Sequence, residues 1–286
     1  MGHLGDWWIL NTNWLSKTTT MYGNRISKEN IYTSKNKFNS IMKNLTKLKL
    51  CIAFIVLSSI IVTGCKKNEE ESPTGKSSTV FNTTKTYNSM TDRDGNVYKT
   101  ITIGTQTWMA ENLRTTTYND DKPIPNVSDP IAWASLLSGA YCNYKDPSDI
   151  DFIATYGRLY NWYALNTGKL APQGWHVPSR AEFTTLINFL GGDAVAGGKL
   201  KETGTTHWLS PNTGATNESG FSALPSGYRG SIDYPFQSLT TATSFWISTD
   251  DGTYSSGRIL RNNDSQAPAY VFEKKMGFPI RLIKDM

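Results

Sequence analysis

The feature that most constrains the fold is a short apolar run that ends beside a cysteine. Residues 50–63 form this run, interrupted only by Ser58 and Ser59, and the eight residues before it contain three lysines. A basic segment followed by an apolar run is typical of a secretory signal. As a helix, the fourteen residues 50–63 would rise only about 21 Å, less than the roughly 30 Å of a hydrocarbon core. The pattern therefore favours a cleaved signal over a spanning anchor, with the folded part of the chain after residue 64.

The end of the apolar run also indicates a covalent anchor. Residues 62–64 read Val-Thr-Gly and precede Cys65, which resembles the lipobox of bacterial lipoproteins, whose cysteine is acylated before the signal is removed. We therefore predict a lipoprotein signal peptide at 42–64 and lipidation of Cys65, so that the chain meets the membrane through its N-terminal lipid. Residues 1–41 show no periodicity or targeting pattern, and we interpret them as a mis-assigned N-terminal extension.

A polar segment follows the expected lipidation site. Residues 66–85 contain three consecutive glutamates, a proline, a glycine and several Ser and Thr residues. Such a composition cannot bury a core, so we predict a flexible tether over 65–86. Lysine rather than aspartate at position 66 favours the outer membrane over inner-membrane retention, and the acidic triplet 69–71 resembles surface-export tags. The predicted location is the outer membrane or the cell surface.

Charge and cysteine content exclude some properties of residues 65–286. The formal net charge is +5, but residues 1–64 hold eight basic and two acidic side chains, which leaves 21 basic and 22 acidic side chains in residues 65–286. A nucleic-acid partner needs a concentrated basic surface on the folded part, so we predict none. After the signal and the lipidated Cys65, Cys142 is the one thiol left, which excludes an internal disulfide in the mature chain.

Residues 87–286 are predicted to form one loop-rich α+β domain with an antiparallel sheet and two main helices. The β-rich run 97–103 and the Asp94-Gly95 turn predict a hairpin with residues 85–87. One helix should begin at Asp129-Pro130 and end at Gly139. A second should begin with the capping box Ser179–Glu182, carry apolar residues spaced i, i+3, i+4 and i+7, and stop at Gly191-Gly192.

The hairpin turn also resembles the start of a calcium loop. Asp92 and Asp94 have the spacing of the first ligands, but the twelfth position is Ile103 instead of the glutamate that such a loop needs. We therefore favour ordinary turn chemistry for these carboxylates and predict no metal site.

Seven segments resemble the Fibrobacter succinogenes major paralogous domain, in order over nearly all of 87–286. They are Asp94–Tyr98, Ile103–Leu113, Tyr160–Tyr163, Gly174–Pro178, Gly198–Glu202, Ala215–Phe221 and the Gly277-Phe278 ending. The resemblance implies a module of bacterial secreted proteins and lipoproteins with no general biochemical assignment. By analogy, its His-Val-Pro-Ser and Gly-Phe-x-x-Arg patterns are similar to C-type-lectin-like and sulfatase-modifying-factor folds, but a fold does not give a function.

No motif nominates an active site. His176 and His207 are the two histidines after residue 64, and the chain has no H-E-x-x-H, G-x-S-x-G, P-loop or G-x-G-x-x-G motif. We predict no catalytic residue and no cofactor, and interpret His176 as a hydrogen-bonded structural residue. A glycoside hydrolase stays open as an alternative, because the separation of its two carboxylates is spatial and is not set by sequence spacing.

A binding function agrees better with the composition. Aromatic rings beside Asn or Glu side chains suit the flat C–H faces and hydroxyls of sugars. The candidate ligand-binding residues are Trp246, Tyr228, Asn217 and Glu218. The alternative for Asn217 and Glu218 is that they tie their own loop to backbone amides. The sequence therefore predicts a non-catalytic recognition or adhesion domain for glycans, with a structural or protein-binding module of the envelope or of fimbriae as the alternative.

Overall fold

The computed structural model describes residues 75–145, 149–230 and 235–286. The chain divides into two compact units, and the second, Glu69–Met286, contains all of these residues. The predicted signal, Cys65 and the first part of the predicted tether lie outside the described residues. Within the described ranges, no helix has both the length and the apolar character needed to cross a bilayer.

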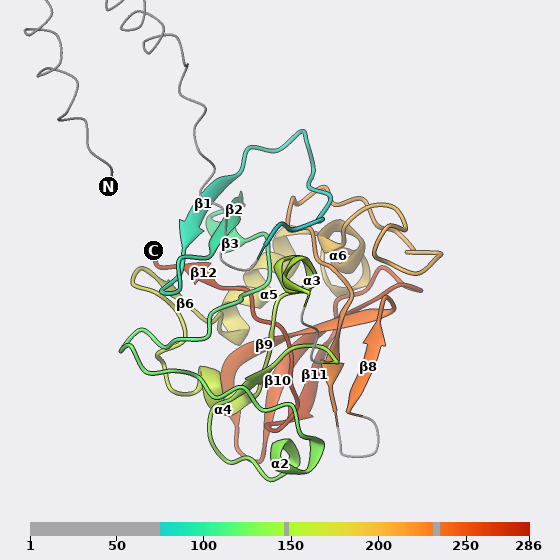
Figure 1. The fold of residues 1–286 in the computed structure, drawn as a ribbon. Coiled ribbons are helices and arrows are strands. Elements are labelled where there is room, and N and C mark those ends of the chain that lie inside the picture. The colour runs from blue at the N-terminus through green and yellow to red at the C-terminus, as the bar shows by residue number, and fades with distance from the viewer. Residues whose placement is uncertain (1–74, 146–148, 231–234) are drawn as a thin grey trace, which may run out of the picture. The chain divides into compact units, whose positions relative to one another are not determined.

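One five-stranded antiparallel sheet joins the first and last strands of the domain. Its strand order is β1 (Asn88–Thr91), β2 (Val97–Ile103), β3 (Gln106–Met109), β12 (Ile283–Lys284) and β6 (Trp175–His176). Strands β1 and β2 form the predicted hairpin, with Met90 opposite Tyr98. Its first strand starts at Asn88, after the residues 85–87 that we predicted. Figure 1 shows β12 in red beside the cyan strands, so that the two ends of the domain are held in one sheet.

The hairpin turn is held by its own carboxylate, as predicted. The Asp92 side chain accepts hydrogen bonds from the backbone N–H groups of Asp94 (3.0 Å) and Asn96 (2.9 Å), and Gly95 has a φ of +82°. A positive φ costs glycine little, which explains this residue at the turn. Burial raises the pKa of Asp92, against the lowering effect of its hydrogen bonds to Tyr98 and Asn96. These contacts are those of a structural turn.

The second five-stranded sheet is built from the C-terminal third of the domain. Its order is β11 (Ala269–Glu273), β10 (Tyr254–Arg261), β9 (Ala242–Asp251), β7 (Ser226–Arg229) and β8 (Phe236–Leu239). The β7–β9 pair is parallel and the others are antiparallel. Strands β4 (Tyr141–Cys142) and β5 (Leu159–Tyr160) form a separate two-stranded sheet. Figure 1 shows the long orange and red strands of this second sheet below helices α5 and α6.

Five described helices accompany the sheets. They are α2 (Pro130–Ala134), α3 (Ile150–Tyr156), α4 (Trp162–Leu165), α5 (Arg180–Phe189) and α6 (Asp193–Leu200). Helix α5 confirms the prediction, with its capping box and with Phe183, Leu186 and Ile187 buried. The other predicted helix is wrong in extent, because α2 ends at Ala134 and not at Gly139. The domain is of mixed α+β class, as predicted, but its second main helix is α6.

Helix α6 was missed because it contains two adjacent glycines. Glycine in a helix interior costs roughly 1 kcal/mol relative to alanine, so a Gly-Gly pair argues against a helix. The structure shows why both are needed: a Cβ at Gly197 would lie 1.9 Å from the Gln266 carbonyl oxygen, and one at Gly198 would lie 2.2 Å from that of Gly214. The missing side chains let two loops pack directly on the helix.

Residues 75–86, which we call the strap, are not a free tether in the structure. The strap packs along the domain through its backbone: Lys76 N–H donates to Asp151 (2.8 Å) and Val80 N–H donates to Glu202 (2.5 Å). Farther along, Asn82 donates to the Asn217 carbonyl at 2.9 Å. The predicted tether boundary at residue 86 is therefore too late, since Lys76, Val80 and Asn82 already contact the domain.

Lys201 is a buried cation that holds backbone carbonyls of separate segments. Its burial makes the free energy of unfolding depend on pH. Its ammonium group is buried and donates to the carbonyls of Thr213, Arg261 and Asp264 at 2.8–2.9 Å. Burial lowers the pKa of Lys201 to about 8, against the opposing attraction of Asp264. Between about pH 8 and the ordinary value of 10.5, the unfolded chain then binds more protons than the folded one. The free energy of unfolding should therefore rise with pH across this window, by at most about 3 kcal/mol.

Urea denaturation at a series of pH values tests this expectation. The comparison is with Lys201→Met, in which no group titrates at this position. The free energy of unfolding of the wild type minus that of the variant should increase from pH 8 to pH 10. Parallel pH profiles for the two proteins would contradict the assignment.

Candidate recognition surface

Trp246, the aromatic residue predicted to stack on a ligand, belongs to the core. Its side chain is 0% exposed, its indole N–H donates to the Tyr160 carbonyl at 2.8 Å, and its ring lies 4.7 Å from that of Phe278. The prediction of an open stacking face is therefore wrong. Strand β9 is buried on both faces over its first six residues, so the alternation that would separate an inner from an outer side chain is absent.

Asn217 takes the structural role that we had given as its alternative. The residue is buried with a φ of +48°, and its side-chain oxygen accepts from Ser222 N–H at 2.9 Å while its amide group donates to Ser222 Oγ at 2.8 Å. The neighbouring Glu218 is exposed and forms an ion pair with Lys199 at 2.8 Å. The loop is thus tied to itself at Asn217, and Glu218 remains at the surface.

Tyr228 is half-buried and does not join the other candidates in one site. Its hydroxyl donates to Gln237 Oε1 at 3.0 Å, and its ring packs 5.8 Å from Phe278, the ring that also contacts Trp246. In the described part of the chain, no hydrogen bond or ring contact links Tyr228 or Trp246 to Asn217 or Glu218. The four predicted residues therefore do not form the aromatic-floored site that the sequence suggested.

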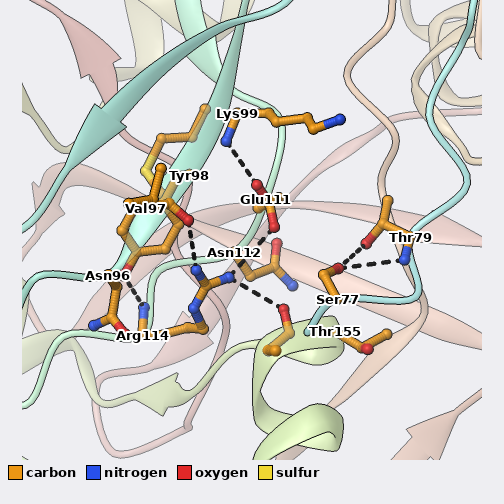
Figure 2. Close-up of polar contacts among 12 residues, drawn as sticks. Ser77, Thr79, Asn96, Val97, Tyr98, Lys99, Glu111, Asn112, Arg114 and Thr155 are labelled. Carbon is orange, nitrogen blue, oxygen red and sulfur yellow. Dashed lines mark hydrogen bonds and ion pairs between the residues drawn. The ribbon is translucent and has the colours of Figure 1, made fainter. Parts of the chain in front are cut away.

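Several charged residues of the 103–113 motif and its neighbourhood are buried rather than displayed. Figure 2 shows Arg114 in one network with Val97 and Glu111. Its guanidinium donates to the carbonyls of Val97 (2.7 Å) and Ala154 (3.1 Å), and Glu111 lies at 3.4 Å. Glu111 in turn accepts from Lys99 N–H at 2.6 Å. Backbone groups of strand β2 and helix α3 are thereby joined through two side chains, so this part of the motif serves the fold.

Arg281 makes a second buried network from the Gly-Phe-x-x-Arg ending. Its guanidinium donates to Asn112 Oδ1 (2.5 Å) and to the carbonyls of Met109 (3.1 Å), Phe221 (2.9 Å) and Ser222 (3.3 Å). Burial lowers the pKa of Arg281 to about 9. The charge is held by oxygen dipoles from two separated segments, 109–112 and 221–222, so the residue fastens the C-terminal end of the chain to the rest of the domain.

His176 is hydrogen-bonded on both ring nitrogens, in agreement with its predicted structural role. Nδ1 lies 2.6 Å from Asp285 and Nε2 lies 2.7 Å from Glu182, the capping residue of α5. Burial alone would lower the pKa of His176, but the bonds and charges of the two carboxylates outweigh it and raise the pKa. Since both nitrogens are occupied, the ring has no free lone pair for a metal, and among the described residues no group of three His, Cys, Asp or Glu side chains could hold one.

An exposed apolar surface lies elsewhere, at the edge of the second sheet. Strand β11 is the last strand of that sheet, and Val271 on it is 61% exposed. Tyr270 on the same strand is 46% exposed, and Tyr254 on the adjacent β10 is 48% exposed. Phe272 points inward and packs 4.6 Å from Phe278, which anchors the strand. We call Tyr254 and residues 269–273 the β11 edge. The sequence showed its β-rich character but not its position at the edge.

Comparison with protein families decides the membership of this chain. A model described as the Fibrobacter succinogenes major domain matches residues 101–284. The chain belongs to the Fibrobacter succinogenes major domain family. The match confirms the resemblance noted in the sequence, although the Asp94–Tyr98 turn lies before its first residue. Searches of curated proteins and of solved structures gave no match.

In this member of the Fibrobacter succinogenes major domain family, the matched range holds the Arg281 network, the β11 edge, and Arg114 and Glu111 of the other network, whose partners Val97 and Lys99 lie before it. It excludes the strap, Cys65 and the predicted signal. The family description names no ligand and no reaction.

Proposed function

We propose that this chain is a lipid-anchored protein of the bacterial outer membrane or cell surface whose domain binds another protein by strand addition at the β11 edge. The lipobox-like Val-Thr-Gly-Cys segment supports the anchor. The exposed edge strand supports the binding mode and favours our protein-binding alternative over glycan recognition. We also propose that the loops over the second sheet follow a C-type-lectin-like or sulfatase-modifying-factor-like arrangement.

The observation that carries the proposal is the unprotected character of β11. An edge strand presents unpaired backbone N–H and C=O groups, and natural proteins usually cover such an edge or place charge, proline or a bulge in it. Strand β11 reads Ala-Tyr-Val-Phe-Glu, with no proline, and its one charged side chain, Glu273, is at its last residue. An extended segment of a partner can pair with such an edge through its backbone, while alternate apolar side chains supply specificity.

The partner expected is an extended protein segment with β-branched or aromatic residues at alternate positions. Such side chains would lie against Val271 and Tyr254, which stand on neighbouring strands of the β11 edge. A glycan is less well matched, because three of the four residues first nominated for sugar binding are buried or half-buried. A glycan array probed with the full-length chain should accordingly show no saturable binding.

Site-specific photo-cross-linking in cells tests the proposal. A benzophenone amino acid at position 271 should form a discrete adduct with another envelope protein. The matched control is position 137, since Leu137 is 75% exposed and apolar but lies outside every described strand. Absence of an adduct at 271, or equal adducts at both positions, would contradict strand addition.

The partner identified in this way should bind Val271→Lys about 10- to 30-fold more weakly than the wild type, because a charge is buried at the centre of the contact. Leu137→Lys should leave the dissociation constant unchanged. Amide hydrogen exchange of residues 269–273 should slow on binding. A contact made by side chains alone would leave these amides unprotected.

A further inference from the structure

The strap places a serine against a buried histidine–carboxylate pair. Ser78 Oγ lies 2.9 Å from His207 Nε2, and His207 Nδ1 lies 2.7 Å from Glu202 Oε2. Burial increases along this line: Ser78 is exposed, His207 is 7% exposed and Glu202 is 0% exposed. A nucleophile in contact with a base that is itself held by a third group is the arrangement used for nucleophilic catalysis.

Proton positions in this cluster follow from the donors and acceptors present. The Glu202 carboxylate accepts from Val80 N–H through Oε1 (2.5 Å), so Oε2 is left for His207. An ionised carboxylate only accepts, so the neutral imidazole carries its hydrogen on Nδ1. Nε2 then presents its lone pair to the Ser78 hydroxyl, as a general base must. Thr155 Oγ1 is a second acceptor for that hydroxyl: it lies 3.0 Å from Ser78 Oγ and donates its own hydrogen to the Asp151 carbonyl at 2.8 Å. The Tyr156 ring, edge-on at 5.7 Å from the His207 ring, packs beside it.

From this geometry we propose that Ser78 is an activated nucleophile, with His207 as its general base and Glu202 as the positioning residue, and that it reacts with acyl esters. The Ser78 Oγ–carbon bond forms as the hydroxyl proton passes to His207 Nε2. The ester C–O bond breaks, and the leaving alcohol takes that proton. Water then attacks the acyl-serine and gives a proton to Nε2. The Oγ–carbon bond breaks, the acid is released, and Oγ recovers the proton.

The same contacts would also be made by a purely structural latch, which fastens the strap to the domain. Glu202→Gln separates the two roles. The glutamine oxygen can still accept from Val80 N–H, and its amide group can donate to His207 Nδ1. The imidazole hydrogen then moves to Nε2 and donates to Ser78, so the strap stays docked while the base is lost.

Labelling of the purified full-length chain by a fluorophosphonate tests the proposal. Ser78 Oγ should displace fluoride from phosphorus, with its proton going to His207, and mass spectrometry should place the adduct on Ser78. Ser78→Ala should abolish labelling, and His207→Gln and Glu202→Gln should slow it about 100-fold, as expected for loss of a general base. Ser77→Ala is the matched control, because Ser77 Oγ contacts Thr79 and not the histidine.

Protection of the strap from proteolysis is measured on the same samples. The proposal expects Glu202→Gln to keep the strap protected while labelling falls, and Glu202→Asp to restore part of the rate. It is overturned if the wild type gives no adduct on Ser78, if Glu202→Gln is labelled as fast as the wild type, or if the wild-type strap is cleaved as readily as an unfolded segment. The cross-linking test of the β11 edge uses none of these residues, so either proposal can fail alone.

Discussion

Arg281→Met should lower the free energy of unfolding by about 4 kcal/mol or more. The substitution removes the donor for three backbone carbonyls and for Asn112 Oδ1, all inside the domain. A buried polar group left without its partner costs about 1–3 kcal/mol, and several are affected at once. The Phe221 and Phe245 rings, 4.7 and 5.7 Å from the guanidinium carbon, would also lose their cationic neighbour.

Guanidinium denaturation of the full-length chain measures this loss. Arg281→Lys should recover only part of it, because a single ammonium group cannot reproduce the planar fork that reaches several carbonyls. The matched control is Arg93→Met, since Arg93 is half-exposed and pairs at the surface with Asp121, and this change should stay within about 0.5 kcal/mol. A loss below 1 kcal/mol for Arg281→Met would mean that the buried network does not hold the C-terminal strand.

Local signals in the sequence predicted the elements that depend on local chemistry. The capping box at Ser179 and the Asp92 turn form as expected because their bonds join residues three or four positions apart. Helix α6 could not be predicted in this way, since its two glycines are explained only by loops that are distant in sequence. The extent of α2 was wrong because Leu136 and Leu137 continue the apolar pattern beyond the last helical residue.

The interior was harder to predict because it is partly ionic. Charged side chains are usually exposed, so nothing in composition places Arg114, Lys201 or Arg281 inside. One signal was present, since Arg281 ends the Gly-Phe-x-x-Arg pattern that carried part of the family resemblance. The opposite error was made at Trp246, whose ring was predicted to bind a ligand but is packed in the core.

The clusters that suggest function were hidden for a different reason. Ser78 and His207 are 129 positions apart, and Ser78 lay in a segment that composition assigned to a flexible tether. The exposure of the β11 edge could not be predicted without the strand order. It follows from the place of β11 at the end of the sheet and not from the residues within the strand.

Loss of the proposed lipidation of Cys65 is the second change with a large expected effect, because the proposed membrane location depends on it. One acyl chain gives only reversible membrane binding, whereas two or more give stable anchoring. With Cys65→Ser no thiol remains at the expected cleavage point, so incorporation of acyl chains should fall to zero. The matched controls are the other two cysteines of the chain, Cys51 and Cys142, whose serine variants should incorporate label fully if Cys65 is the acylated residue.

Metabolic labelling with radioactive palmitate, followed by mass analysis of the N-terminal peptide, tests the anchor directly in cells that make the full-length chain. We predict label in the wild type, in Cys51→Ser and in Cys142→Ser, none in Cys65→Ser, and a mature chain that begins with acylated Cys65. Equal label in Cys65→Ser, or a mature chain that begins at another residue and carries no lipid, would contradict the account.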